Sequence, residues 1–292
     1  MRWKRKKVIK AGLFETARRS LAGYKANPVL FVPPLVAFFV SILTPVILSR
    51  VVAVPREGFP TITLSLLMAG FGVLFLLSVV SFLVILGQAN MSGKVITEGK
   101  TRLADWGIGI RKYFFRVLGI GLVFLGIMFV LFMIVMVAYA LTILPKIITP
   151  EGVITPPITP TPQTTYMDWT MTLITALIMT IAQSFFYIWL APAILDDKGI
   201  GTSLDLGIKT IRKSGRVFVG FIVLFLIVSA IATLVNSFPA IIGVTVPPLV
   251  GSLTPTSIVS QIIEKIFSPL WFLIAFTIYH QHSVQTAEIT SG

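Results

Sequence analysis

The sequence lacks cysteine altogether and contains few charged residues. Only 12% of its 292 residues are charged, against roughly 25% in ordinary globular proteins, whereas 55% are hydrophobic. The mean hydropathy is +0.93. The absence of cysteine excludes disulfides, thiolate metal sites and iron–sulfur clusters. The balance of charged and apolar residues excludes a soluble domain and a disordered chain, and it indicates an integral membrane protein.

Sequence motifs of catalysis and cofactor binding are also missing. There is no phosphate-binding loop, no nucleophile elbow and no HExxH motif. The two histidines, His280 and His282, are two positions apart, do not share a helix face and have no third ligand nearby. We therefore predict no catalytic, cofactor-binding or metal-binding residue and no cofactor. Asparagine (three) and glutamine (six) are scarce as well, which is typical of thermophilic proteins, although membrane composition produces a similar bias.

Six apolar runs are each long enough to cross a bilayer as a helix, which needs about 20 residues. They predict an all-α, six-span protein that forms a single membrane domain over residues 1–292. The predicted spans are Pro28–Val52, Ile62–Leu86, Val117–Leu144, Trp169–Leu195, Val217–Phe238 and Ser257–Tyr279. Prolines 33, 34 and 45 predict a kinked or irregular first span.

Basic residues alternate between the connections and predict the orientation. Twenty of the 24 Lys and Arg lie in the segment up to Lys25 and in the connections between spans 2 and 3 and between spans 4 and 5. By the positive-inside rule, both termini and these two connections are cytoplasmic and the protein lies in the cell membrane. The net charge of +13 then reflects topology and anionic lipid, not nucleic acid.

The predicted external connection, residues 145–168, differs in composition from the others. It contains six prolines and many threonines, which predicts an extended, polyproline-like segment. One interpretation is a loop stiffened by proline. The other is a segment that binds a partner or carries O-linked glycans.

The two basic connections resemble each other at an offset of 100 residues. Seven identities fall in 25 positions, among them Asp105 with Asp205 and Arg116 with Arg216. Each segment runs into a long apolar span. With a looser match in the N-terminal segment, this predicts three parallel tandem repeats, 8–88, 98–195 and 200–282, each an amphipathic helix followed by a transmembrane hairpin.

The amphipathic helices, predicted over 101–116 and 202–216, have an apolar stripe and a basic face. Thr202 and Asp205 resemble a capping box. Such helices lie in the membrane interface, where each cation contributes about 1 kcal/mol near an anionic surface. They either only fix topology or form a specific lipid or partner site. The candidates for contact with lipid headgroups are Arg111, Lys112, Arg116, Lys209, Arg212, Lys213 and Arg216.

Polar residues inside the spans are the other candidates, because burying them in lipid is costly. These are Gln183, Asn236, Glu264 and Lys265. Glu264 and Lys265 either lie at the interface or face a cavity. The pair Asp196-Asp197 ends the fourth span and predicts a turn; two carboxylates suit a cation, but no further ligand is nearby in the sequence.

The segments ETARRSLAGYKANPVLFVPPLV and APAILDDKGIGTSLDLGIKTIRKSGRVFVGFIVLF resemble uncharacterised six-span archaeal and bacterial membrane families. These families are similar to the membrane domain attached to some glycerophosphodiester phosphodiesterases. The resemblance implies a helical membrane module. The catalytic barrel of those enzymes is absent from this sequence, so no active-site residue carries over.

The leading functional hypothesis is a non-enzymatic membrane module that binds lipid or a small amphiphilic substrate, as a transporter-like protein or a scaffold. The alternative is the membrane subunit of a larger permease-type complex, with another membrane or cytoplasmic protein as its partner. A membrane enzyme of lipid metabolism is the third hypothesis. A transporter should place Gln183, Asn236 and Glu264 on the inside of the bundle, whereas an enzyme should gather carboxylates near Arg116 or Arg216.

Overall fold

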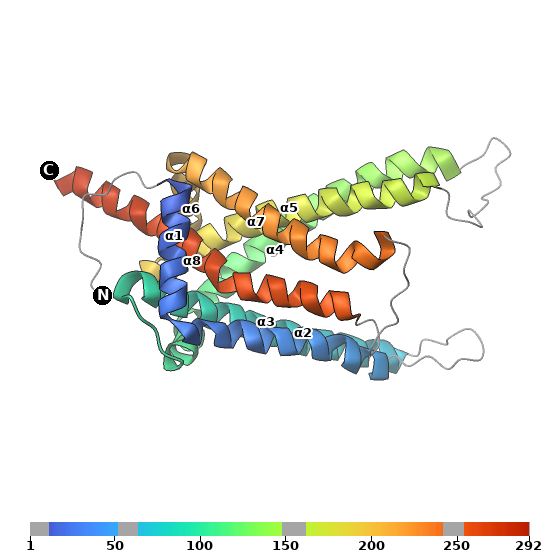
Figure 1. The fold of residues 1–292 in the computed structure, drawn as a ribbon, viewed down its shortest axis with the longest axis horizontal. Helices are drawn as coiled ribbons and strands as arrows, with labels where there is room; N and C mark the ends of the chain where they lie inside the picture. Colours follow the sequence, from blue (N-terminus) through green and yellow to red (C-terminus); the bar gives the residue numbers. More distant parts are fainter. Residues whose placement is uncertain (1–11, 52–63, 148–161, 242–253, 292) are drawn as a thin grey trace.

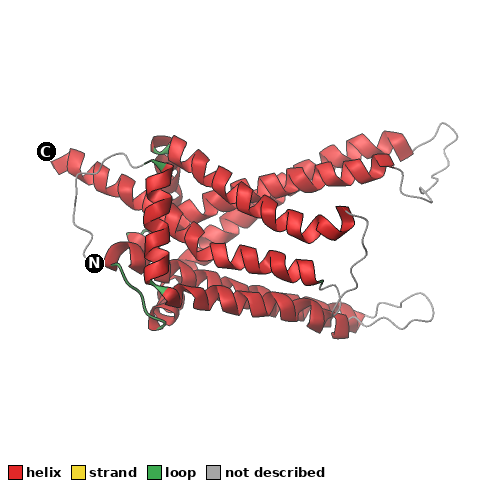
Figure 2. Ribbon diagram, viewed as in Figure 1, coloured by secondary structure: helices red, strands yellow, loops and turns green. Residues whose placement is uncertain are grey.

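The computed structural model describes residues 12–51, 64–147, 162–241 and 254–291, which contain helices and no strand (Figure 2). The elements are α1 (Leu13–Ala26), the short 3₁₀ helix η1 (Pro28–Phe31), α2 (Val32–Val51), α3 (Leu64–Glu98), α4 (Ala104–Ile147), α5 (Pro162–Leu195), α6 (Ile200–Lys213), α7 (Gly215–Ile241) and α8 (Pro255–Ser291). Six of the described helices, α2 with η1, α3, α4, α5, α7 and α8, are long and apolar enough to cross a membrane. The predicted all-α, six-span fold is confirmed.

The spans form a bundle whose two ends differ (Figure 1). At one end, α1 and α6 lie across the bundle beside the connection from α3 to α4 and the last turns of α8. This end, called the basic end below, carries the exposed cations of α1, α4 and α6, among them Arg18, Arg111 and Arg212. At the opposite end, the pairs α2–α3 and α4–α5 diverge, and α7 and α8 lie between them.

Several helix boundaries differ from the predicted ones. The second span was predicted to end at Leu86, but α3 continues to Glu98. Most of residues 87–98 are small or polar, yet the segment is largely buried against neighbouring helices, Ala89 and Ser92 completely. Hydropathy measures how well a residue suits lipid, but these residues face protein. The hydropathy pattern therefore does not predict that the helix continues beyond Leu86.

The amphipathic helix predicted over 101–116 is not a separate element but the first turns of the 44-residue helix α4. Its apolar stripe, with Ile110 and Phe114, packs on the core and continues into Val117 without a break. By contrast, α6 and α7 are separated at Ser214, the residue that caps the C-terminus of α6. The capping box expected at Thr202 is also wrong, because α6 already begins at Ile200 after Gly199, which makes no side-chain cap.

The proline-rich segment 145–168 lies mostly outside the described residues, and its last part, from Pro162, already belongs to α5. Proline is tolerated there because the first turn of a helix needs no internal N–H donor. Prolines 33 and 34 occupy the first turn of α2, and Pro45 lies inside that helix.

The packed core lies in the half of the bundle nearest the basic end. On α8, every residue from Pro269 to Tyr279 is buried, whereas residues 254–266 are mostly half-buried or exposed. Phe221, Phe272 and Phe276 are fully buried at the centre of this core. Around it, α4 exposes large apolar side chains such as Phe115 and Phe129, as a lipid-facing helix does.

Small residues set the closest helix contacts. A Cβ atom at Gly87 would lie 1.3 Å from the ring of Trp106, and one at Gly207 would lie 2.5 Å from that of Trp189. On α4, a Cβ atom at Gly119 would meet Ile200, but one at Gly121 or Gly126 would have no neighbour within 4 Å.

Candidate functional site

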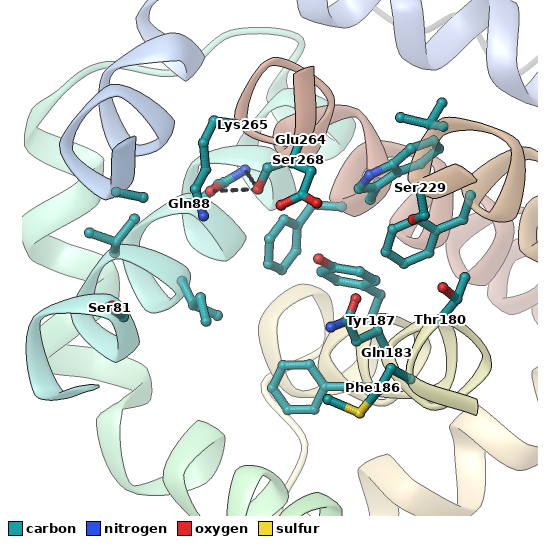
Figure 3. A pocket seen from close by; sticks show the side chains of 18 of the residues that line it. Ser81, Gln88, Thr180, Gln183, Phe186, Tyr187, Ser229, Glu264, Lys265 and Ser268 are labelled. Atoms are coloured by element: carbon teal, nitrogen blue, oxygen red, sulfur yellow. Dashed lines mark hydrogen bonds between the residues drawn. The ribbon is translucent and has the colours of Figure 1, made fainter. Parts of the chain in front are cut away.

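A polar cavity of about 500 Å³ lies among α2, α3, α5, α7 and α8, just beyond the packed core (Figure 3). Every one of these helices contributes at least one hydroxyl side chain to the lining, and α3 and α5 also contribute an amide. The polar residues are Ser41, Ser81, Gln88, Thr180, Gln183, Ser229, Thr233, Glu264, Lys265 and Ser268. A water-accessible space with this lining, inside a bundle of membrane spans, is suited to a polar or partly polar ligand.

Two opposite charges on neighbouring positions of α8, Glu264 and Lys265, dominate this cavity. Figure 3 shows the carboxylate of Glu264 directed into the space that also receives the amide of Gln183 and the hydroxyl of Tyr187. Within the described part of the chain, neither Glu264 nor Lys265 forms an ion pair within 4 Å.

Gln88 and Ser268 connect the opposite walls of the cavity. The amide of Gln88 on α3 donates to the Ser268 hydroxyl at 3.0 Å, and this hydroxyl also lies 3.3 Å from Gln88 Oε1. Ser268 follows Lys265 by one turn of α8. The two residues therefore place neutral donors and acceptors beside the charged groups.

An apolar groove of about 370 Å³ lies next to the polar cavity, between α4 and α5. Its lining is hydrophobic and includes Leu131, Ile178 and Trp189. Phe124 lines both spaces, and its ring is 5.0 Å from that of Phe186 in the polar cavity. The polar and the apolar space thus lie on two sides of the Phe124 side chain.

Pro269 marks the border between the packed and the open half of α8. Proline has no N–H and displaces the preceding turn, which weakens the helical hydrogen bonds there. The Tyr24 hydroxyl of α1 donates to the carbonyl of Ile266 at 2.8 Å and satisfies a group of this weakened turn. Glu264 and Lys265 lie directly on the open side of this turn.

At the basic end, the predicted turn at Asp196-Asp197 is confirmed, and Asp197 has a φ of 58°. Each carboxylate joins this turn to another helix. Tyr279 of α8 donates to Asp196 at 2.5 Å, while Arg116 of α4 donates to Asp197. The Arg116 hydrogen bond holds the pKa of Asp197 below its usual value. The pair therefore closes the basic end of the bundle by linking α5 to α4 and α8.

The predicted headgroup candidates divide into two groups. Three are engaged with carboxylates: Arg116 and Lys112 with Asp197, and Lys209 with Asp205. The other four are exposed and have no ion-pair partner among the described residues: Arg111, Arg212, Lys213 and Arg216.

The two aspartates of the sequence repeat have different surroundings. Asp105 is 6% exposed, accepts a bond from the Arg102 N–H at 2.8 Å and pairs with Lys94 at 2.9 Å. Asp205 is exposed and contacts Lys209, one turn further along the same helix. Asp105 therefore has a structural role at the start of α4 that Asp205 does not share at α6.

Of the four intramembrane candidates, the structure brings three together and separates one. Gln183, Glu264 and Lys265 line the polar cavity, whereas Asn236 is exposed on α7 and does not line it. Sequence reasoning missed Gln88 and Tyr187 as members of the same site. Like Gln183, Gln88 is an amide side chain next to an apolar run. It was not among the candidates because it lies beyond the predicted end of its span.

Comparisons of this chain with protein-family models, curated proteins and solved structures found no match. The resemblance to the membrane domain of some phosphodiesterases thus stays a prediction.

Proposed function

We propose that this protein is an integral membrane module that binds an amphiphile in the cavity around Glu264, in the manner of a transporter. The observation that carries the proposal is that two spaces of different character lie on either side of Phe124. A polar cavity with two charged side chains adjoins an apolar groove at Phe124. A molecule with a polar head and an apolar tail is the class of ligand that suits both linings.

The distribution of packing supports transport over a purely structural role. The bundle is tightly packed at the basic end, where the Asp196–Tyr279 and Asp197–Arg116 contacts join three helices. It opens beyond Pro269 toward the opposite end. A site that is closed on one side and open on the other is what alternating access requires.

The charge distribution supports a cytoplasmic location for the basic end. Its exposed arginines and lysines match the positive-inside rule, so the cavity would open toward the external side of the cell membrane. Arg111, Arg212, Lys213 and Arg216 would then face anionic headgroups of the inner leaflet.

Native mass spectrometry of the protein, gently extracted from its own membrane, tests the proposal. Ser229 lines the cavity, whereas Ile231, two residues further on the same helix, is 48% exposed on the outside. A bound small molecule should be present in the wild type and in Ile231→Trp, and absent in Ser229→Trp. A molecule retained by Ser229→Trp refutes the proposal. A second polypeptide in place of the small molecule favours a subunit of a larger complex.

A further inference from the structure

We infer that the amphiphile bound in the cavity carries a zwitterionic head, with a cationic and an anionic group a few bonds apart. This inference rests on the proposed function and specifies its ligand. It starts from Glu264 and Lys265, which line one cavity, carry opposite charges and form no ion pair with each other or with another described residue.

Glu264 is exposed and Lys265 half-buried on the open half of α8, so water solvates both charges in the ligand-free protein, and a ligand that displaces this water must supply each charge with a counter-charge. Consecutive helical positions diverge by about 100°, which keeps the carboxylate and the ammonium apart. A ligand with one charge leaves one of these groups uncompensated. A head with both charges compensates both groups and adds no net charge to the bundle.

The surroundings of Glu264 suit a cationic group, whereas those of Lys265 suit an anionic group. The ring of the half-buried Tyr187 lies on the side of the cavity into which Glu264 points, and it packs edge-on against the buried ring of Phe272, with centroids 4.7 Å apart. Aromatic faces attract cations, in particular quaternary ammonium groups. Glu264 and the Tyr187 ring therefore form the side of the cavity that suits the cationic group.

Lys265 has hydrogen-bonding neighbours instead. In Figure 3 its side chain extends past Gln88 and Ser268, which are linked by a hydrogen bond of 3.0 Å. An amide N–H, a hydroxyl and an ammonium are donors that suit phosphate oxygens. The ligand class is thus a lipid with a phosphocholine or phosphoethanolamine type of head.

The apolar groove identifies the source of this head as a lipid and not a free zwitterion. The groove of about 370 Å³ shares the lining residue Phe124 with the polar cavity. A small water-soluble zwitterion would leave it unused, whereas an alkyl chain fits its hydrophobic lining.

Four probes with the same alkyl chain test the inference: dodecylphosphocholine, dodecyltrimethylammonium, dodecyl sulfate and dodecyl maltoside. Each is titrated at submicellar concentration onto the intact protein in a neutral detergent, and bound molecules are counted by native mass spectrometry. We expect dodecylphosphocholine to bind at least about tenfold more tightly than the singly charged and neutral probes, a difference of about 1.4 kcal/mol. Glycerophosphocholine, which has the head without the chain, should bind much more weakly.

Conservative variants separate the two charges. Glu264→Gln should remove the preference for dodecylphosphocholine over dodecyl sulfate, and Lys265→Gln should remove its preference over dodecyltrimethylammonium. Elution as a monodisperse peak shows that each variant is folded.

The Ser229→Trp variant separates a failure of the zwitterion inference from a failure of the proposed function. If Ser229→Trp abolishes binding but both charge variants bind dodecylphosphocholine normally, the cavity is the site and the zwitterion inference is wrong. If Ser229→Trp changes the binding of no probe, the proposed function itself fails. Equal binding of glycerophosphocholine would assign the site to a free zwitterion and overturn the lipid assignment.

Discussion

The hydroxyl of Tyr279, near the end of the packed half of α8, donates a hydrogen bond of 2.5 Å to Asp196, just beyond the end of α5. The two residues are 83 positions apart in the sequence, and their contact joins the fourth and sixth spans at the basic end. Next to it, Asp197 joins the same turn to Arg116 of α4. Stability at this end should therefore depend on a few identifiable polar contacts.

Tyr279→Phe should destabilise the protein by about 1–3 kcal/mol, because a hydrogen bond to a carboxylate is lost in a half-buried place. Asp196→Asn should have a smaller effect, since the amide oxygen can still accept the bond. Thermal unfolding in detergent measures both. Equal losses in the two variants would show that the charge of Asp196, and not its hydrogen bond, matters.

The stability supplied by Asp197 should depend on pH. Because the Arg116 hydrogen bond lowers the pKa of Asp197 in the folded protein, this stability is fully present above the ordinary pKa of 3.8 and is lost as the pH falls through the lowered value. Asp197→Asn should thus lower the melting temperature at neutral pH, and the difference from wild type should vanish in strong acid. A difference that stays constant down to pH 2 would contradict the assignment. The side chain is 49% exposed, so the effect is small.

Gly87→Ala should strongly destabilise the bundle. The added methyl group would lie 1.3 Å from the ring of Trp106, whose indole N–H is fixed by a bond to the carbonyl of Leu83. Overpacking of this kind typically costs about 1–3 kcal/mol. Gly121→Ala is the matched control, because nothing lies within 4 Å of its Cβ position; it should be neutral or slightly stabilising through helix propensity. Similar melting temperatures of the two variants would rule out close packing at Gly87.

Asp105→Asn and Asp205→Asn test whether the two aspartates of the repeat differ in role. Asp105 is nearly buried and pairs with Lys94, so its loss should cost about 1–3 kcal/mol. Asp205 is exposed and contacts only the next turn of its own helix among the described residues, so its loss should cost about 0.5 kcal/mol or less. Chemical unfolding of both variants gives the comparison. Equal costs would mean that the two carboxylates are structurally equivalent despite their different surroundings.

The existence of the six spans could be predicted from sequence because each contains a long apolar run. Their ends could not, because the polar and small residues of 87–98 are buried against protein, not exposed to water. The fusion of the basic segment 104–116 with α4 was missed for a related reason. Its apolar stripe and that of the span lie on one continuous helix, and charge alone does not end a helix.

The cavity was only partly predictable. Glu264 and Lys265 were recognised because charges are rare within apolar spans. Asn236 has a similar polar signal but is exposed on α7, since a helix that is apolar all round carries no pattern to indicate which face is inside. One cavity is lined by Gln88, Tyr187 and Ser268, which come from three different helices. Their proximity depends on how these helices pack, so no local sequence pattern predicts that they share a site. The three tandem repeats stay a prediction.

The continuity of α4 has a mechanical consequence. Its 44 residues make a rod about 66 Å long at 1.5 Å per residue, and Arg116 fastens it to Asp197 about 18 Å from its first residue. If that contact acts as a fulcrum, the far arm of about 47 Å is roughly two and a half times the near arm. A small swing of the first turns of α4 at the membrane surface would then be magnified at the opposite end, where α4 diverges from α2 and α3.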